Sequence, residues 1–442
     1  MKKRILIDLT DFQNWRGHFT GIQRVIYEIG SRIYDQDEYI VEGFVYNERK
    51  KEFYASSADI LSHPSHEEVG LKDDSILVKR RSAKDIAIKT GKKLYTKLPH
   101  YAKKLSSKTY HTSRHYAGVI LNNTVKPVVQ GTKDRITGNM PVPVQFQSTD
   151  LVLILGAGWH KRTMPDNLSA KKTDVGFDVH VLIHDVIPIV KPEYFGVGLP
   201  EVYGQFMFEM MPIASQVYAI SKSTKKDIEY FCGAYNVPLP KVVVIREGDS
   251  FVKYESSKKP RELLAEPGTF ILAVGTFEVR KNYQVLYQAV KMAQLRGVTL
   301  PKIVIVGRKG WLTSDLEYLL KYDMSVKENI VHLHNVSDSE LSWLYANTLF
   351  TVYPSLYEGW GLPIAESLFY GKFCLSSDTS SMPEVAGDFA EYVNPYNVEG
   401  WMEKIAYYGN NPEALKEKQD TIVRYYKPTD WSVPTQAIID RA

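Results

Sequence analysis

Two glutamates, Glu358 and Glu366, lie eight residues apart around a glycine-rich turn in the sequence LYEGWGLPIAES. An apolar run typical of a strand precedes the turn, and Pro363 suits the first turn of a helix. The N–H groups expected to be free at this helix start, and therefore able to bind phosphate or sugar oxygens, are those of Trp360, Gly361 and Leu362. At about 1.5 Å per residue, Glu366 would lie about 6 Å further along. A nucleotide-sugar, with hydroxyl groups at both ends and a diphosphate between them, fits this spacing.

A second loop supplies positive charge. In ILAVGTFEVRKNYQVL a strand ends at Gly275, and Arg280 and Lys281 stand just before Asn282, where a helix begins. Cations at a helix N-terminus oppose the helix dipole, whereas a glutamate there is ordinary dipole chemistry. We therefore expect these cations to stabilise a departing diphosphate. A third strand end, IVGRKGW, adds Arg308 and Lys309 with less specificity.

The first half of the chain offers weaker candidates. Gly21 in FTGIQRV precedes a predicted helix, where the backbone can approach a ligand closely, although a plain turn explains it nearly as well. His184 ends the strand VHVLIH and is followed by Asp185. A lone histidine is more often a core residue, but this position at a strand end favours a cleft. Less specific candidates follow another strand, at Arg246, Glu247 and Asp249.

The elements that would position these residues form two α/β domains. Strand-like runs alternate with helical stretches, a pattern that predicts parallel sheets with right-handed crossovers. The predicted strands are RILIDL, DLVLILG, DVHVLIH and QVYAI, then FILAVG, KIVIVG, IVHLHN, LFTVYPS and KFCLSS. We place a first domain at residues 1–255 and a second at 256–424. Ligands bind such doubly wound domains at the carboxyl ends of the strands.

Composition limits the class of protein. The 442 residues are 44% hydrophobic and 24% charged, which is typical of a globular protein. No apolar run reaches the length of a membrane span, and no signal-peptide core follows the N-terminus. The two cysteines, Cys232 and Cys374, fit buried thiols in a reducing compartment. We therefore expect a cytoplasmic protein.

Basic charge is concentrated in one segment. Between Lys79 and Arg114 lie 12 Lys and Arg residues against only Asp85, although the whole chain has a net charge of +4. The segment belongs to a polar insertion that we place at about residues 54–136. A solvated surface, nucleic-acid binding and docking on anionic lipid are the three interpretations. We favour lipid at the inner membrane face, because aromatic and leucine residues alternate with the lysines and no nucleic-acid motif is present.

Together these motifs resemble family 4 of the retaining glycosyltransferases, which have the GT-B fold of two Rossmann-like domains facing each other across a cleft. The run from VSDSEL to NVEGW resembles that family throughout, with a Glu-x7-Glu motif at Glu358 and Glu366. VGTFEVRKN resembles the diphosphate loop of its mannosyltransferase-like branch. The first domain resembles the family more loosely, through TGIQRVIYEI, LIHDVIPIVKPEYF and VYAISKSTKKDI. The family resemblance implies that a C-terminal helix at 425–442 crosses back to the first domain.

The resemblance implies a role for each matching residue. Glu366 would hold the donor ribose, Glu358 the hydroxyls of the transferred sugar, and Lys281 the leaving diphosphate. The implied catalytic residues are His184, Arg280, Lys281 and Glu358. The implied donor-binding residues are Gly21, Gly275, Thr276, Arg280, Lys281, Glu358, Gly359, Trp360, Gly361, Leu362 and Glu366. Many members have arginine where this chain has Thr276, so the role of Arg280 in replacing that charge stays open.

The resemblance also implies a reaction. A hexose or deoxyhexose, first mannose from GDP-mannose, would pass with retention of configuration to a glycan or lipid-linked glycan in cell-surface polysaccharide synthesis. No cofactor or metal is implied, and Asp35-Gln36-Asp37 is interpreted as a polar turn. The alternatives are a dTDP-rhamnose or UDP-sugar donor, another GT-B enzyme such as a phosphorylase or epimerase, and a non-catalytic scaffold subunit that binds glycan. Such a subunit would not need Lys281, Glu358 and Glu366.

Overall fold

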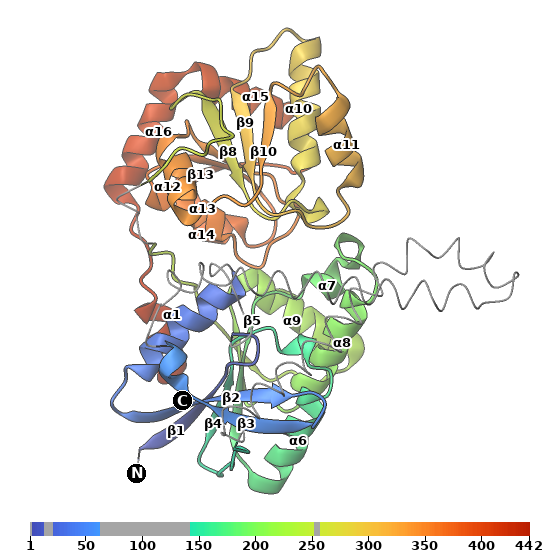
Figure 1. The fold of residues 1–442 in the computed structure, drawn as a ribbon, viewed down its shortest axis with the longest axis vertical. Helices are drawn as coiled ribbons and strands as arrows, with labels where there is room; N and C mark the ends of the chain where they lie inside the picture. The colour runs from blue at the N-terminus through green and yellow to red at the C-terminus, as the bar shows by residue number, and fades with distance from the viewer. Residues whose placement is uncertain (1, 13–20, 62–141, 252–256) are drawn as a thin grey trace, which may run out of the picture. The chain divides into compact units, whose positions relative to one another are not determined.

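The structure is a computed structural model that describes residues 2–12, 21–61, 142–251 and 257–442. Residues 1–62 and 144–442 form one compact unit that contains every helix and strand described below (Figure 1). The predicted basic segment, Lys79 to Arg114, lies outside the described residues, as does most of the predicted insertion.

The first sheet has seven strands within the described residues, in the order β3-β2-β1-β4-β5-β6-β7. Its neighbouring strands pair in parallel, apart from the antiparallel pair of β2 and β3. The strands are β1 (Lys3–Asp8), β2 (Tyr39–Asn47), β3 (Glu52–Ser56), β4 (Leu151–Ile154), β5 (Asp178–Ile183), β6 (Gln216–Ala219) and β7 (Lys241–Val244).

Strand β3 contains residue 54, where we placed the approximate start of the insertion. Strand β3 continues to Ser56, and a 3-10 turn, η1 (Ala58–Leu61), follows it. Phe53 and Leu61 are fully buried, so this short edge hairpin belongs to the sheet domain. The described part of the sheet domain therefore continues to Leu61.

The helices of the first domain connect these strands. They are α1 (Ile22–Tyr34), α6 (Met164–Val175), α7 (Ile187–Val190), α8 (Leu199–Met210) and α9 (Lys222–Tyr235), with 3-10 turns η3 (Gly158–His160) and η4 (Pro192–Tyr194). Helix α1 has the predicted bounds because its apolar residues recur every three or four positions and face the core. Helix α9 begins after Ser221, whose hydroxyl accepts a hydrogen bond from the Thr224 N–H as an N-cap.

The second sheet is parallel, in the order β10-β9-β8-β11-β12-β13. This order, with the first strand at the centre, is that of a doubly wound sheet. The strands are β8 (Phe270–Val274), β9 (Lys302–Val306), β10 (Ile330–Leu333), β11 (Thr351–Tyr353), β12 (Cys374–Ser377) and β13 (Ala390–Val393). Strand β13 was not predicted; its sequence AEYV is short and half polar.

The helices of the second half follow in turn. They are α10 (Tyr283–Leu295), α11 (Ser314–Tyr322), α12 (Asp338–Asn347), α13 (Leu362–Phe369), α14 (Met382–Ala386), α15 (Val398–Asn410), α16 (Pro412–Tyr425) and α17 (Ser432–Ile439), with 3-10 turns η5 (Val279–Lys281) and η6 (Gly387–Phe389). Helix α12 begins with a capping box, in which Ser337 and Glu340 satisfy each other's backbone N–H groups.

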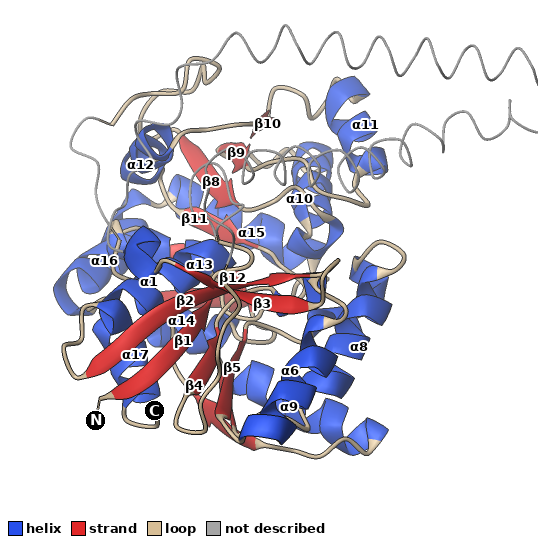
Figure 2. Ribbon diagram, turned by 60° about the horizontal axis from the view of Figure 1, so that its bottom comes forward, coloured by secondary structure: helices blue, strands red, loops and turns tan. Residues whose placement is uncertain are grey.

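The central strands of both sheets, such as β4, β6 and β8, are buried on both faces, as their mainly apolar sequences predict. Successive side chains point to opposite faces. On β8, Ile271 and Ala273 pack in the cluster that includes α10 and α15, whereas Phe270 and Leu272 pack against α12. In the first domain, α1 and α17 cover one face and α6, α8 and α9 the other (Figure 2).

The C-terminal segment packs on the first domain. Helix α17 contacts α1, and the Trp431 ring lies where a Cβ at Gly248 would be, 2.4 Å from its Cδ2. Asp249 accepts a hydrogen bond from the Tyr426 hydroxyl at 2.9 Å. A side chain at position 248 would displace the tryptophan, so glycine is required there.

Candidate active site

Three loops of the second domain meet at the carboxyl edge of its sheet. They follow β8, β11 and β12, which are neighbours in the sheet, so parallel pairing brings their ends together. The β8 loop carries Arg280 and Lys281 in η5, the β11 loop carries Glu358, and the β12 loop carries Ser380. These loops contain most of the predicted donor-binding residues.

The predicted cations and the first predicted glutamate form one buried ion cluster. Lys281 Nζ lies 2.6 Å from Glu358 Oε1, and Arg280 donates to Glu358 Oε2, also at 2.6 Å. The other side of the Arg280 guanidinium contacts Glu278 Oε1 at 2.6 Å. Lys281 Nζ also donates to the Tyr353 hydroxyl at 2.7 Å. Two cations and two carboxylates therefore balance one another out of contact with most solvent.

The electrostatics of this cluster follow from burial and pairing. Burial alone raises the pKa of Glu358, but Arg280 and Lys281 outweigh it and lower that pKa to about 2. Burial lowers the pKa of Lys281, and the charge of Arg280 adds to this effect against the opposing pull of Glu358. Burial raises the pKa of Glu278. The Glu358 carboxylate is thus ionised and fixes the positions of both cations.

The backbone that follows Glu358 is held by two serines. The Glu358 N–H donates to Ser380 Oγ at 2.9 Å, and Ser381 Oγ donates to the carbonyl oxygens of Glu358 and Trp360 at 3.0 and 2.6 Å. Gly361 has a φ of 136°, which favours glycine, and α13 begins at Leu362. The turn therefore directs the first N–H groups of α13 toward the same edge as the ion cluster. The Trp360 indole itself is buried.

The second glutamate has separate partners. Glu366 accepts a hydrogen bond from the Tyr345 hydroxyl at 2.6 Å, and Arg24 of α1 lies 3.6 Å from its other carboxylate oxygen. Burial raises the pKa of Glu366. The Arg24 guanidinium also lies over the Phe251 ring, 4.7 Å from its centre. Glu366 thus has one hydrogen-bond donor, the Tyr345 hydroxyl, and one cation, Arg24, beside its carboxylate.

His184 stands directly after β5 and is buried. Its Nε2 lies 2.8 Å from the Leu155 carbonyl oxygen, and because a carbonyl only accepts, Nε2 is the protonated nitrogen. Its Nδ1 lies 3.8 Å from Glu247 Oε1. The backbone of His184, rather than its ring, contacts the second domain, since a Cβ at Gly359 would lie 2.2 Å from the His184 carbonyl oxygen.

Further contacts join the loops of the two sheets. Glu384 of α14 accepts hydrogen bonds from the N–H groups of Lys222 and Ser223, at 2.7 and 2.8 Å, at the start of α9. The Tyr357 hydroxyl lies 2.9 Å from both carboxylate oxygens of Asp227. These contacts hold the β11 and β12 loops against α9.

The remaining predicted residues are more dispersed. Gly275, at the end of β8, lies against Lys281, since its Cβ would be 3.1 Å from Lys281 Cε. Thr276 is exposed on the same loop, and Gly21 precedes α1 with a φ of 51°. Arg246 pairs with Asp249 at 2.7 Å, beside the C-terminal segment. Lys309 pairs with Glu317, and Arg308 is exposed.

Several residues of the site were not predicted. Glu278 stands within the cation loop, so its position was a signal that could have been used. Tyr345 and Tyr353 are ordinary aromatic residues of a helix and a strand, and Arg24 follows Gly21 in a helix that reads as packing. Nothing in their sequence neighbourhood identifies them, because their contacts cross from 21 to more than 300 residues.

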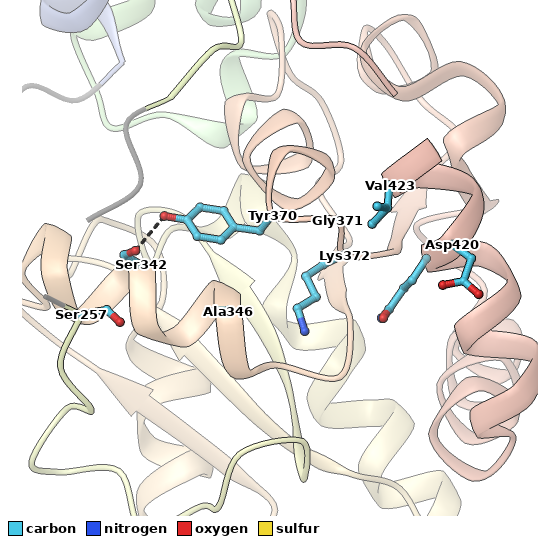
Figure 3. Close-up of a pocket in the computed structure, with 9 residues that line it drawn as sticks. Ser257, Ser342, Ala346, Tyr370, Gly371, Lys372, Asp420 and Val423 are labelled. Atoms are coloured by element: carbon cyan, nitrogen blue, oxygen red, sulfur yellow. Dashed lines mark hydrogen bonds between the residues drawn. The ribbon is translucent and has the colours of Figure 1, made fainter. Parts of the chain in front are cut away.

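A pocket of about 420 Å³ lies among α12, the turn after α13 and α16 (Figure 3). Its wall residue Tyr370 bonds Ser342 and stacks on Tyr345, with ring centres 5.2 Å apart. Its lining contains no predicted site residue and consists of Ser257, Ser342, Ala346, Tyr370, Gly371, Lys372, Gln419, Asp420 and Val423.

The described residues contain neither a candidate metal site nor a candidate transmembrane helix. No group of three His, Cys, Asp or Glu side chains there is arranged to hold a metal ion. No helix in that part of the chain is both long and apolar enough to cross a membrane.

Residues 255–426 match the family model of the glycosyl transferases group 1. The chain is 27% identical over 246 residues to the O-antigen chain mannosyltransferase RfbU of Salmonella typhimurium, covering 55% of this chain and 65% of the relative. It is 28% identical over 223 residues to the O-antigen chain mannosyltransferase B of Escherichia coli, covering 49% and 57%. The chain thus spans less than two thirds of the length of either relative.

Solved structures share the whole fold. The Anabaena protein HepE in complex with UDP has a TM-score of 0.57 at 12% identity, with 99% of each chain covered. The sucrose-phosphate synthase of Thermosynechococcus elongatus has the same TM-score at 14% identity, with 99% and 98% covered. With the two doubly wound sheets, these likenesses confirm the predicted α/β GT-B fold. The match of residues 255–426 to the glycosyl transferases group 1 model confirms the resemblance to glycosyltransferases found in the sequence.

Proposed function

We propose that this protein is a retaining glycosyltransferase that moves mannose from GDP-mannose to a glycan or lipid-linked glycan during cell-surface polysaccharide synthesis. The observation that carries the proposal is the buried cluster of Arg280, Lys281 and Glu358 at the strand ends of a group 1 domain. The names of the two O-antigen mannosyltransferase relatives support the choice of sugar and acceptor.

The cluster suits a diphosphate leaving group. The two cations are already in place, with their charge balanced by Glu358 and Glu278, before any ligand binds. Preorganised charge of this kind stabilises a developing anion without reorganisation during the reaction. We propose that Glu366, about 6 Å further along α13, accepts hydrogen bonds from the ribose hydroxyls, and that the first N–H groups of α13 bind the diphosphate or the sugar.

The contacts of Glu358 favour a role that differs from the sugar-binding role implied by the family resemblance. The sequence assigned it to the transferred sugar and the two cations to the diphosphate, as separate tasks. Both of its oxygens contact a cation in the structure. We propose that it positions Arg280 and Lys281 and uses its remaining lone pairs for a sugar hydroxyl.

The proposed reaction balances without a covalent enzyme intermediate. The bond between the sugar C1 and the β-phosphate oxygen breaks, and the acceptor oxygen bonds to C1 on the same face. The proton of the acceptor hydroxyl passes to the departing phosphate oxygen. The His184 carbonyl oxygen, which is in contact with Gly359, would border the reacting groups in this proposal. We propose that neither a cofactor nor a metal takes part, since Arg280 and Lys281 supply the positive charge.

A transfer assay tests the proposal. The protein is incubated with GDP-mannose, dTDP-rhamnose or UDP-glucose and α-manno-oligosaccharides, and nucleotide release and the anomeric configuration of the product are followed by NMR. We expect GDP release and an α-linked product from GDP-mannose. Lys281→Ala should lower the rate at least about 100-fold, whereas the control Lys372→Ala, a half-buried lysine bonded to the Thr348 carbonyl, should not. A folded parent that transfers no sugar contradicts the proposal.

The predicted cytoplasmic location and inner-membrane contact remain proposals, since the basic segment from Lys79 to Arg114 lies outside the described residues. Sedimentation with anionic vesicles, with and without its lysines replaced, measures that contact directly.

A further inference from the structure

Four aromatic side chains from three loops gather beside the ion cluster. Tyr194 ends η4 and Phe195 follows it, Trp311 lies between β9 and α11, and Tyr396 lies between β13 and α15. The Trp311 Nε1 donates to the Tyr194 carbonyl oxygen at 2.7 Å, and the Phe195 and Trp311 ring centres lie 6.1 Å apart. The Tyr396 side chain bonds that of Tyr194. We call these four residues the aromatic rim.

The backbone carries the aromatic rim to the edge of the candidate active site. The Val279 N–H donates to the Trp311 carbonyl oxygen at 3.3 Å, one residue before Arg280. Asn282, one residue after Lys281, donates to the Pro395 carbonyl oxygen at 2.8 Å, beside Tyr396. The aromatic rim therefore adjoins both ends of the segment that carries the cations.

The first domain reaches the rim through the loop of His184. This loop runs from His184 and Asp185 through α7 to η4, which ends at Tyr194. The Coulomb field of Arg280 acts on the Asp185 carboxyl, so this loop lies close to the ion cluster as well. The aromatic rim thus lies where the strand-end loops of both sheets meet.

Two of the four rings, those of Trp311 and Tyr396, are exposed although their polar atoms are hydrogen-bonded, whereas Tyr194 is buried. Trp311 is 40% exposed and Tyr396 is 71% exposed, and neighbouring Val197 is fully exposed. Phe195 is half-buried. Trp311 is thus oriented by its N–H bond with part of its ring left open. Packing does not explain why this loop exposes an indole.

Saccharides are the occupants that this chemistry fits best. A pyranose ring has an apolar face of C–H groups and an edge of hydroxyl groups, so it packs on flat aromatic faces and bonds polar neighbours. Exposed charged residues, Glu193 and Arg308, adjoin the rings in sequence. A lipid tail would favour apolar surroundings without these charged residues.

We propose that Trp311, Phe195 and Tyr396 form an acceptor subsite that stacks on a pyranose ring of the acceptor glycan next to the residue that receives the new sugar. This inference rests on the proposed function and adds the part of the acceptor that the protein recognises. A sugar held there lies beside, and does not occupy, the donor position at Arg280 and Lys281.

Acceptor kinetics test the subsite. The variants are Trp311→Ala, Trp311→Phe and Tyr396→Ala, with Tyr318→Ala as control, an exposed aromatic of α11 that is 64% exposed and packs on Tyr322. Initial rates are measured with GDP-mannose and α-manno-oligosaccharides of two to five residues. Hydrolysis of GDP-mannose without acceptor and the thermal shift by GDP are measured for the same samples.

The expected result distinguishes a loss of acceptor binding from a loss of donor binding. Trp311→Ala and Tyr396→Ala should raise the acceptor KM at least tenfold, with GDP-mannose hydrolysis and the GDP shift unchanged. Trp311→Phe should recover most of the loss, and Tyr318→Ala should match the parent. The rise in acceptor KM should be larger for the longer oligosaccharides than for the disaccharide.

Three outcomes overturn the inference. One is an acceptor KM that does not change in either alanine variant. Another is a fall of hydrolysis and transfer together, which shows that Trp311 only braces the loops. The third is loss of binding to anionic phospholipid vesicles with an unchanged acceptor KM, which assigns the rim to a membrane. A parent that neither hydrolyses GDP-mannose nor transfers its sugar contradicts the proposed function instead.

Discussion

Gly359 and His184 are in backbone contact: a Cβ at position 359 would lie 2.2 Å from the His184 carbonyl oxygen. Real Cβ atoms do not approach a backbone oxygen so closely, so only glycine fits. The Thr224 hydroxyl lies 3.4 Å from the Gly359 carbonyl oxygen and 3.5 Å from that of His184. The loop of the predicted catalytic histidine is thus fixed against the loop of the Glu-x7-Glu motif.

We predict that Gly359→Ala abolishes most transfer activity. The new methyl group meets backbone rather than a flexible side chain, so one of the two loops must move, and a shift of about 1 Å can cost about 100-fold in rate. Gly204→Ala is the control, because Gly204 lies in α8 with no atom near its Cβ and should gain up to about 1 kcal/mol. Rates and melting temperatures are compared; a Gly359→Ala variant with the rate of the parent contradicts the contact.

A second prediction concerns the ion cluster and pH. Arg280 and Lys281 lower the pKa of Glu358 from 4.5 to about 2 against the effect of burial, so the folded state favours the ionised form. Its contribution to stability is complete above about pH 4.5 and is lost as the pH falls toward 2. Glu358→Gln should therefore lower the free energy of unfolding at pH 7 by roughly 3–5 kcal/mol, since two buried cations lose their partner.

Urea unfolding at pH 7 and pH 3.5 measures this effect. The difference in unfolding free energy between the parent and Glu358→Gln should be smaller at pH 3.5 than at pH 7. Glu399→Gln, which removes an exposed partner of Arg296, should cost less than about 1 kcal/mol at either pH. A difference that is the same at both pH values contradicts the assigned ionisation.

Much of this fold was readable from the sequence. Helix α1 has its predicted bounds because five of its residues recur with helical spacing and are buried. The strands that were missed are β2, β3 and β13. The longer β2 was missed because Glu42 and Gly43 interrupt its apolar run. Strands β3 and β13 have four or five residues with polar members, too few for a period to show. The same limit explains why the approximate start of the insertion, at residue 54, was placed within β3.

The site was predictable in its residues but not in its partnerships. Arg280, Lys281 and Glu358 were identified by type and position at strand ends, but they were given separate tasks. Their contact joins segments 77 residues apart, and it depends on β8 and β11 being neighbours in the sheet. Residue types indicate chemistry, whereas side-chain pairing depends on strand order that a single sequence does not state.

A buried carboxyl in the first domain should make stability depend on pH in the opposite sense. Burial, and then the charge of Asp11, raise the pKa of Asp8 from 3.8 to about 7. The folded state therefore favours the neutral form, and stability is lost as the pH rises from about 4 to 7. Asp8→Asn cannot ionise, so its advantage over the parent should grow across this range.

Unfolding free energies at pH 5 and pH 8 check this prediction. Asp8→Asn should be more stable than the parent at pH 8 by more than at pH 5, and the asparagine carbonyl can still accept the bond from the Thr10 N–H. Asp37→Asn, at an exposed carboxyl of the same domain, should show no such change. If the difference in unfolding free energy between Asp8→Asn and the parent is the same at pH 5 and pH 8, Asp8 is ionised in the folded protein, which contradicts the prediction.

If the strand ends of the second domain hold a nucleotide-sugar, the protein should bind the matching nucleotide on its own. Melting temperatures are measured with GDP, UDP and dTDP for the parent, for Glu366→Ala and for Glu403→Ala, an exposed glutamate of α15. At about a hundred times its dissociation constant, a ligand adds about 2.7 kcal/mol of stability. We predict that GDP raises the melting temperature of the parent and of Glu403→Ala by a few degrees but leaves Glu366→Ala unchanged. A folded parent that responds to none of the three nucleotides, or a Glu366→Ala variant that responds as the parent does, contradicts the account.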